Sequence, residues 1–138
     1  MGNSYSVRKI NFEDMQSFIK DPNVVIVNTL PASNQDCLIK GSISASEETG
    51  IINSILSTDL NKKLIIYGMN ACDESLNYKY NQLAKLGFSN MYVYVGGLFE
   101  WLLLQDIYGD DNFPTTKKEP DILKYKGDIM SKKLMLTY

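Results

Sequence analysis

The stretch YVYVGGLFEW, residues Tyr92–Trp101, joins an aromatic and β-branched run to two glycines and a strongly apolar segment. Its pattern predicts a strand over Met91–Val95, a turn at the glycine pair and a helix over residues 98–108. A helix that is apolar on all sides is either buried or covered by a partner. We therefore expect this helix to lie between a sheet and the C-terminal tail, or to present a patch to another protein.

Two more runs upstream predict buried strands, VVIVN at Val24–Asn28 and LIIY at Leu64–Tyr67. Both are almost wholly apolar, as strands of a parallel sheet covered on both faces are. Between the strands, apolar residues recur at helical spacing and follow capping residues. Helices are expected from Asn11 to about Lys20, from Ser46 onward and over Asp73–Leu86. Strands that alternate with helices predict one three-layer α/β domain with a central parallel sheet flanked by helices.

Composition excludes several classes of site and partner. The 138 residues contain no histidine and carry a net charge of −2, which excludes histidine-based catalysis and provides no general attraction to nucleic acid. Two cysteines, Cys37 and Cys72, are too few for a structural zinc site, so we expect no metal and no cofactor. No secretory signal is visible and no stretch reaches the roughly 20 apolar residues of a membrane span, so the default localisation is cytoplasmic.

The ends of the chain differ from its centre. We assign residues 1–113 to the domain and residues 114–138 to a C-terminal tail with weak periodicity. This tail is expected to dock on the domain or on a partner. The opening MGNSYS fits the N-myristoylation pattern, so an association with membranes is expected only if Gly2 is acylated.

Several segments in order resemble the rhodanese domain. Tyr92–Trp101 is similar to the family's closing pattern, which runs valine-tyrosine-x-x-x-Gly-Gly-x-x-x-Trp, and LAKLGFSNMYVY before it looks like the family's leucine-x-x-x-Gly-Phe-x-Asn-Val-Tyr segment. IKGSI at residues 39–43 resembles the His-Ile-Pro-Gly-Ala-Ile turn, and VIVNTL at 25–30 stands where the family has an Ile-Asp-Val-Arg strand end. The strand LIIY then takes the place of the strand before the active-site loop. The resemblance spans about Phe12 to Leu104.

This resemblance implies sulfur transfer. In the family, a cysteine thiolate at the start of the loop attacks a sulfane donor, becomes a persulfide and passes the sulfur on. The thiolate is the nucleophile, and backbone N–H groups together with the following helix stabilise it.

The sequence departs from the family where its chemistry is organised. Gly68 stands at the usual nucleophile position, and no arginine follows in the loop, because Arg8 is the only arginine of the chain. Leu38 replaces the usual His, Lys40 replaces Pro, and Asn28-Thr29-Leu30 replaces Asp-Val-Arg.

Cys72 is the candidate catalytic residue that remains, four residues later in the loop. The beginning of a helix would favour its thiolate, whereas Asp73 and Glu74 would disfavour it. The alternative interpretation makes Cys72 a small half-buried residue beside the helix cap. A redox pair with Cys37 would need their Cα atoms within about 7 Å. The candidate binding loop comprises Gly68, Met69, Asn70, Ala71, Asp73, Glu74 and Ser75.

Two functions follow from these observations. The first is a rhodanese-like pseudoenzyme that serves as a binding or structural module, as in a subunit of a larger assembly, with its protein partner on the tail or on the 98–108 helix. The second is an atypical sulfurtransferase or thiol redox enzyme that carries a persulfide on Cys72. A phosphatase on the same fold would need a Cys-x5-Arg loop, which is absent.

Overall fold

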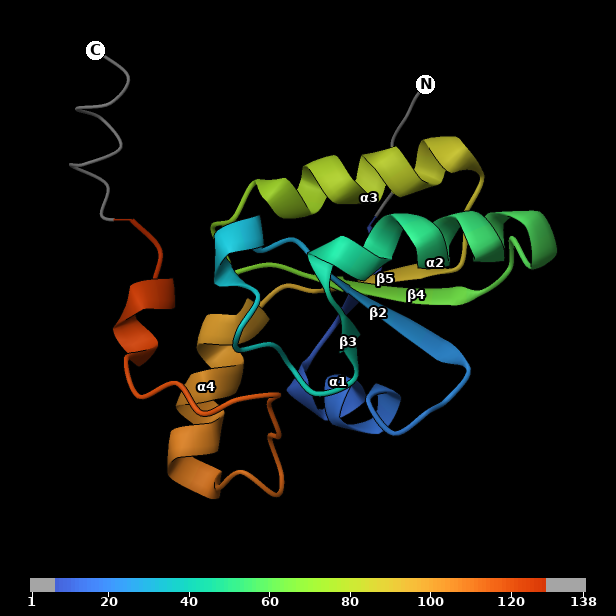
Figure 1. Cartoon of the computed structure of the whole chain (residues 1–138). Helices are drawn as coiled ribbons and strands as arrows, with labels where there is room; N and C mark the ends of the chain where they lie inside the picture. Colours follow the sequence, from blue (N-terminus) through green and yellow to red (C-terminus); the bar gives the residue numbers. More distant parts are fainter. Residues whose placement is uncertain (1–6, 129–138) are drawn as a thin grey trace, which may run out of the picture.

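Five parallel strands form one sheet at the centre of the chain (Figure 1). The computed structural model describes residues 7–128. The strands lie in the order β1-β5-β4-β2-β3, so β1 neighbours β5 and β4 neighbours β2 although these strands are not consecutive in the chain. Their bounds are Lys9–Ile10 (β1), Val24–Asn28 (β2), Ser42–Ile43 (β3), Lys63–Tyr67 (β4) and Met91–Tyr94 (β5).

Helices cover both faces of this sheet (Figure 1). Helices α1 (Phe12–Phe18) and α4 (Gly97–Tyr108) pack on one face, and α2 (Ala45–Thr58) and α3 (Ser75–Leu86) pack on the other. Successive side chains of a strand point to opposite faces. In β4, for example, Ile65 joins the core beneath α1 and α4, whereas Ile66 joins the core beneath α2 and α3. The expected three-layer α/β architecture is confirmed.

Local capping and pairing shift several predicted bounds. Helix α2 begins at Ala45 rather than Ser46, because Ser44 is its N-cap and exchanges hydrogen bonds with Glu47. Helix α3 begins at Ser75 rather than Asp73. Strand β1 was not predicted. Its two residues, Lys9 and Ile10, pair with β5 but are too few to form a recognisable pattern.

Residues 114–117 are hydrogen-bonded to the segment before β3. Lys40 N–H donates to the Pro114 carbonyl at 3.0 Å, and Thr116 N–H donates to the Leu38 carbonyl at 2.8 Å. The indole N–H of Trp101 also donates to Pro114, at 3.1 Å. A short 3₁₀ helix, η2 (Ile122–Tyr125), then packs beside α4. The described part of the tail therefore lies on its own domain.

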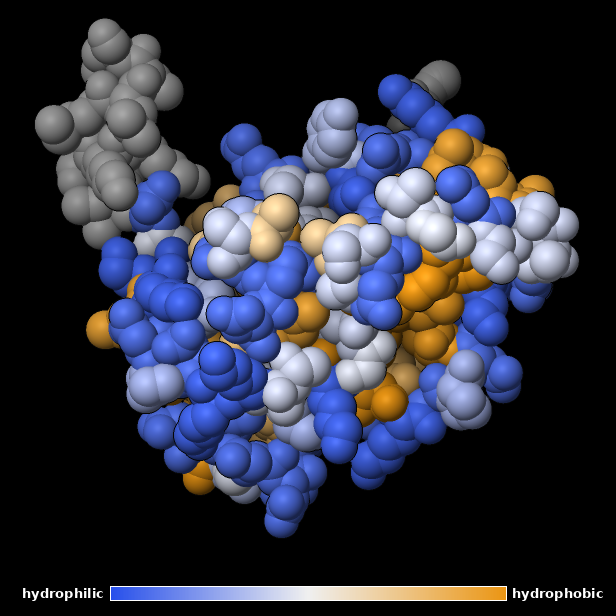
Figure 2. Space-filling model, in the orientation of Figure 1, coloured by the Kyte–Doolittle hydropathy of each residue, from blue (hydrophilic) through white to orange (hydrophobic). Residues whose placement is uncertain are grey.

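Helix α4 is buried on one side only. Trp101 is fully buried, whereas Leu103 and Ile107 are 40% and 68% exposed on the opposite side. On the face shown in Figure 2, hydrophilic residues predominate around α4, and hydrophobic residues show mainly near α2. No helix within residues 7–128 is long and apolar enough to cross a bilayer. Gly2 lies outside the described residues.

Candidate functional site

The loop between β4 and α3 lies at the carboxyl end of the sheet, where ligand sites form in open α/β folds. A pocket of about 640 Å³ opens in front of this loop. One wall of the pocket comes from Thr29 and Pro31, which follow β2. The opposite wall comes from residues 126–128, which follow η2.

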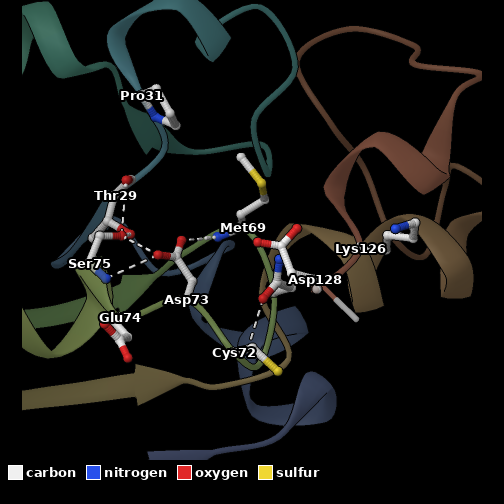
Figure 3. Close-up of a pocket in the computed structure, with 11 residues that line it drawn as sticks. Thr29, Pro31, Met69, Cys72, Asp73, Glu74, Ser75, Lys126 and Asp128 are labelled. Carbon is white, nitrogen blue, oxygen red and sulfur yellow. Dashed lines mark hydrogen bonds between the residues drawn. The ribbon is translucent and has the colours of Figure 1, made fainter. Parts of the chain in front are cut away.

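The carboxylate of Asp73 fills the centre of the loop (Figure 3). Its Oδ2 accepts the Met69 N–H at 2.8 Å, and its Oδ1 accepts the Ser75 N–H at 3.0 Å. The Ser75 hydroxyl donates to the same Oδ1 at 2.6 Å and is hydrogen-bonded to the Thr29 hydroxyl at 2.8 Å. A carboxylate supplied by the chain itself thus accepts two N–H groups of this segment, those of Met69 and Ser75.

The Asp73 carboxylate occupies the space that a side chain at position 68 would need, and a glycine stands there. A Cβ built on Gly68 would lie 2.7 Å from Asp73 Oδ2 and 2.9 Å from Thr29 Oγ1. Real Cβ atoms essentially never approach other atoms this closely. A cysteine at position 68 and the observed Asp73 carboxylate therefore exclude each other.

The start of α4 is hydrogen-bonded to the loop. Its amides donate to the loop carbonyls, Leu98 N–H to Gly68 at 3.0 Å and Phe99 N–H to Met69 at 2.9 Å. Gly97, with a φ of +69°, allows this approach, because a Cβ there would lie 2.6 Å from the Gly68 carbonyl oxygen. Two backbone hydrogen bonds therefore join the loop to the helix.

Cys72 is outside this hydrogen-bond network. Its side chain points away from the Asp73 carboxylate (Figure 3), and its N–H donates to Asn70 Oδ1 at 2.9 Å. The thiol is free and exposed, which corrects the expectation of a half-buried residue. Cys72 also precedes the helix N-cap, Glu74, so it does not sit on the first turn of α3.

Cys37 has different surroundings. It is 2% exposed and its thiol donates to the Lys117 carbonyl at 3.2 Å. Burial raises the pKa of this thiol. Both cysteines are free, so the described structure contains no Cys37–Cys72 disulfide.

A pair of neutral side-chain amides lies behind the pocket. Asn28, which is 3% exposed, donates to Gln35 Oε1 at 3.0 Å and accepts from Gln35 Nε2 at 2.9 Å. Asn28 also donates to the Ile43 carbonyl and accepts from the Leu30 N–H, so its amide is fully satisfied. In the sequence Asn28 is visible only as a substitution, and Gln35 stands in no recognisable motif. The spacing of the two residues gives no sign of their pairing.

The charge of the pocket does not suit an anionic donor. Asp73, Glu74 and Asp128 line it together with one cation, Lys126. Negative side chains beside the thiol oppose the approach of an anion. Among residues 7–128, no three histidine, cysteine or acidic side chains gather closely enough to hold a metal ion.

The sequence model of the Rhodanese-like domain family matches residues 11–104 of the chain. The chain belongs to this family. No curated protein is significantly similar to it in sequence. The resemblance seen in the Gly-Gly segment is thereby confirmed.

Solved structures share the fold of this rhodanese-like domain. The crystal structure of the Alr3790 protein from Anabaena sp. has a TM-score of 0.58 at 20% identity, covering 93% of this chain and 90% of that chain. A protein from Saccharomyces cerevisiae has a TM-score of 0.55 at 22% identity, covering 72% and 93%. Thiosulfate sulfurtransferase from Pseudomonas aeruginosa has a TM-score of 0.56 at 17% identity, covering 70% of this chain and 19% of that one. At these identities the likeness concerns the fold alone.

Proposed function

We propose that this rhodanese-like domain lacks standard sulfurtransferase activity and serves as a binding or structural module. The observation that carries the proposal is the Asp73 carboxylate inside the active-site loop. In sulfur transfer, the inward N–H groups of such a loop stabilise a thiolate or persulfide. Here the Asp73 carboxylate accepts two of the loop's N–H groups, those of Met69 and Ser75.

An external anion competes poorly for this position. Asp73 is tethered to the loop, so its effective concentration at the N–H groups is high. An entering anion would also have to replace the Ser75 hydroxyl bond and would face Glu74 at the pocket wall. Both effects disfavour the binding of thiosulfate or mercaptopyruvate at this site.

The alternative, a persulfide on Cys72, rests on one observation. The thiol is free, exposed and part of the pocket lining. It is separated from the loop N–H groups, however, and lies next in sequence to Asp73 and Glu74. Exposure makes Cys72 reactive toward small reagents without giving it the stabilisation that persulfide transfer requires.

A transfer assay separates the two functions. The wild-type protein is incubated with thiosulfate or 3-mercaptopyruvate, and thiocyanate formation from cyanide is followed together with peptide mass spectrometry of Cys72. We expect no turnover above that of the matched Cys72→Ala variant and no persulfide on the peptide. Turnover that the Cys72→Ala variant loses would overturn the proposal in favour of the alternative.

The proposed module would also need a surface on which a partner binds. The tail and α4 are the segments where a partner is expected, and Leu103, Ile107 and Leu123 are their strongly exposed aliphatic side chains. Isolated apolar side chains on a surface are common, so these residues do not define an interface by themselves. They are the positions at which mutations would test for one.

A further inference from the structure

The segment of residues 118–128, here called the strap, runs along α4 and ends at the active-site loop (Figure 1). Its anchor is Tyr125, which is 2% exposed. The ring belongs to the same core cluster as Leu30, Tyr67 and Tyr94, which stand at or directly after the carboxyl ends of three strands. In open α/β sheets this edge is where ligands bind. The strap thus puts a side chain of the chain itself where a ligand is expected.

One buried amide joins the strap to the loop. Asn70, 8% exposed, donates from Nδ2 to the Tyr125 carbonyl at 2.9 Å. Its Oδ1 accepts the Cys72 N–H at 2.9 Å. The same side chain therefore shapes the loop and fastens the strap.

Two ion pairs also involve the strap. Lys118 pairs with Asp110 at 3.2 Å, and both side chains are more than half exposed. Lys124 pairs with Glu119 inside the strap itself. Exposed ion pairs contribute little to stability. Tyr125, the partly buried Ile122 and the Asn70 hydrogen bond attach the strap to the domain away from solvent.

We propose that the strap is an intramolecular ligand and that its site accepts, in trans, a partner segment with the same Ile-x-x-Tyr pattern. The aromatic ring would fill the position of Tyr125, and the backbone carbonyl of that residue would accept the Asn70 amide. This deepens the proposed binding module, on which it rests, by naming the chemistry of the partner. While the strap is docked, it occupies the site and keeps such a segment out.

Peptide binding to the full chain tests this proposal. A fluorescent peptide of residues 118–128 is titrated into wild-type protein and into the Tyr125→Ala variant, whose site is empty. We expect it to bind the variant at least about tenfold more tightly than wild type, as the loss of an internal competitor implies. The same peptide carrying Tyr125→Ala should not bind. Equal binding to both proteins, or no binding to a folded variant, would overturn the proposal.

A second variant covers the case in which Tyr125→Ala fails to fold. In the Asn70→Ala protein, amide exchange should rise in residues 118–128 while β4 and β5 keep their protection. Leu123→Ala, at an exposed strap position, is the matched control and should change neither. An equal rise across the sheet would show that the strap is an inseparable part of the core. A persulfide on Cys72 would contradict the proposed function yet leave the peptide result unaffected, so the two failures are distinguishable.

Discussion

Replacing Gly68 by alanine should destabilise the folded protein, because the new methyl group would compete with the Asp73 carboxylate for one position. The added Cβ would lie 2.7 Å from Asp73 Oδ2 and 2.9 Å from Thr29 Oγ1. Gly68 has no positive φ, so its backbone accepts alanine without strain and the cost comes from this contact alone.

The expected loss of stability follows from the displacement of the Asp73 carboxylate. Displacing the carboxylate weakens its bonds from the Met69 and Ser75 amides, and hydrogen bonds to charged groups contribute about 1.5–3 kcal/mol. Overpacking a filled site costs about 1–3 kcal/mol by a separate route. Against this, a glycine-to-alanine change restricts the unfolded chain and gains about 0.4–1 kcal/mol. We expect a net loss of about 2 kcal/mol in the free energy of unfolding, as the balance of these terms.

A double-mutant cycle isolates the contact. Urea unfolding, followed by the fluorescence of the buried Trp101, is measured for wild type, Gly68→Ala, Asp73→Ala and the double variant. In the Asp73→Ala background, Gly68→Ala should cost less than about 1 kcal/mol, since only the Thr29 contact remains.

The matched control is Gly50→Ala in α2, where an added Cβ meets nothing within 4 Å. This change should stabilise by about 0.5–1 kcal/mol, the helix propensity difference. An equal cost of Gly68→Ala with and without Asp73 would refute the reasoning.

Three further results are expected. At pH 8, iodoacetamide should alkylate exposed Cys72 in the native protein, while Cys37, whose burial raises its pKa, should react only in denaturant; comparable native rates would contradict this. Asn28→Ala should lower the free energy of unfolding by about 1–3 kcal/mol, because it leaves the Leu30 N–H and the Ile43 carbonyl without the buried Asn28 amide, and a neutral effect in urea unfolding would argue against these hydrogen bonds. Hydrogen bonds from Ser44 lower the pKa of Glu47 below 4.5, so its contribution to stability is present above pH 4.5 and is lost as the pH falls through the folded-state value. An NMR titration should show this low pKa, and Glu47→Gln should remove that part of the acid dependence.

Local chemistry explains which elements could be predicted. β2 begins and ends at the residues predicted, because a β-branched run buried on both faces is an unmistakable strand pattern. β1 forms only because it can pair with β5. A strand of two residues is too short to show an alternating hydrophobic pattern. The position of a helix start within a loop is also poorly encoded, as the shift of α3 to Ser75 shows.

The loop 68–75 could be singled out from the sequence, but its geometry could not. Ordered family segments placed the loop, and the bare Gly68 was visible. Asp73, however, was interpreted as an acid near a helix start, whereas its carboxylate turns back to the Met69 amide four residues earlier. The orientation of Cys72 depends on Asn70, which is fixed by Tyr125 far along the chain. No local pattern encodes a contact of that range.

Amide hydrogen exchange at Met69 and Ser75 tests the central claim most directly, namely that the Asp73 carboxylate fills the loop between β4 and α3. Both N–H groups donate to the Asp73 carboxylate. In wild type, residue-resolved NMR should show both amides protected, and Asp73→Ala should speed their exchange by about tenfold or more, as the loss of a charge-assisted hydrogen bond implies. Exchange equally fast in wild type and in the variant would show that the carboxylate does not occupy the loop.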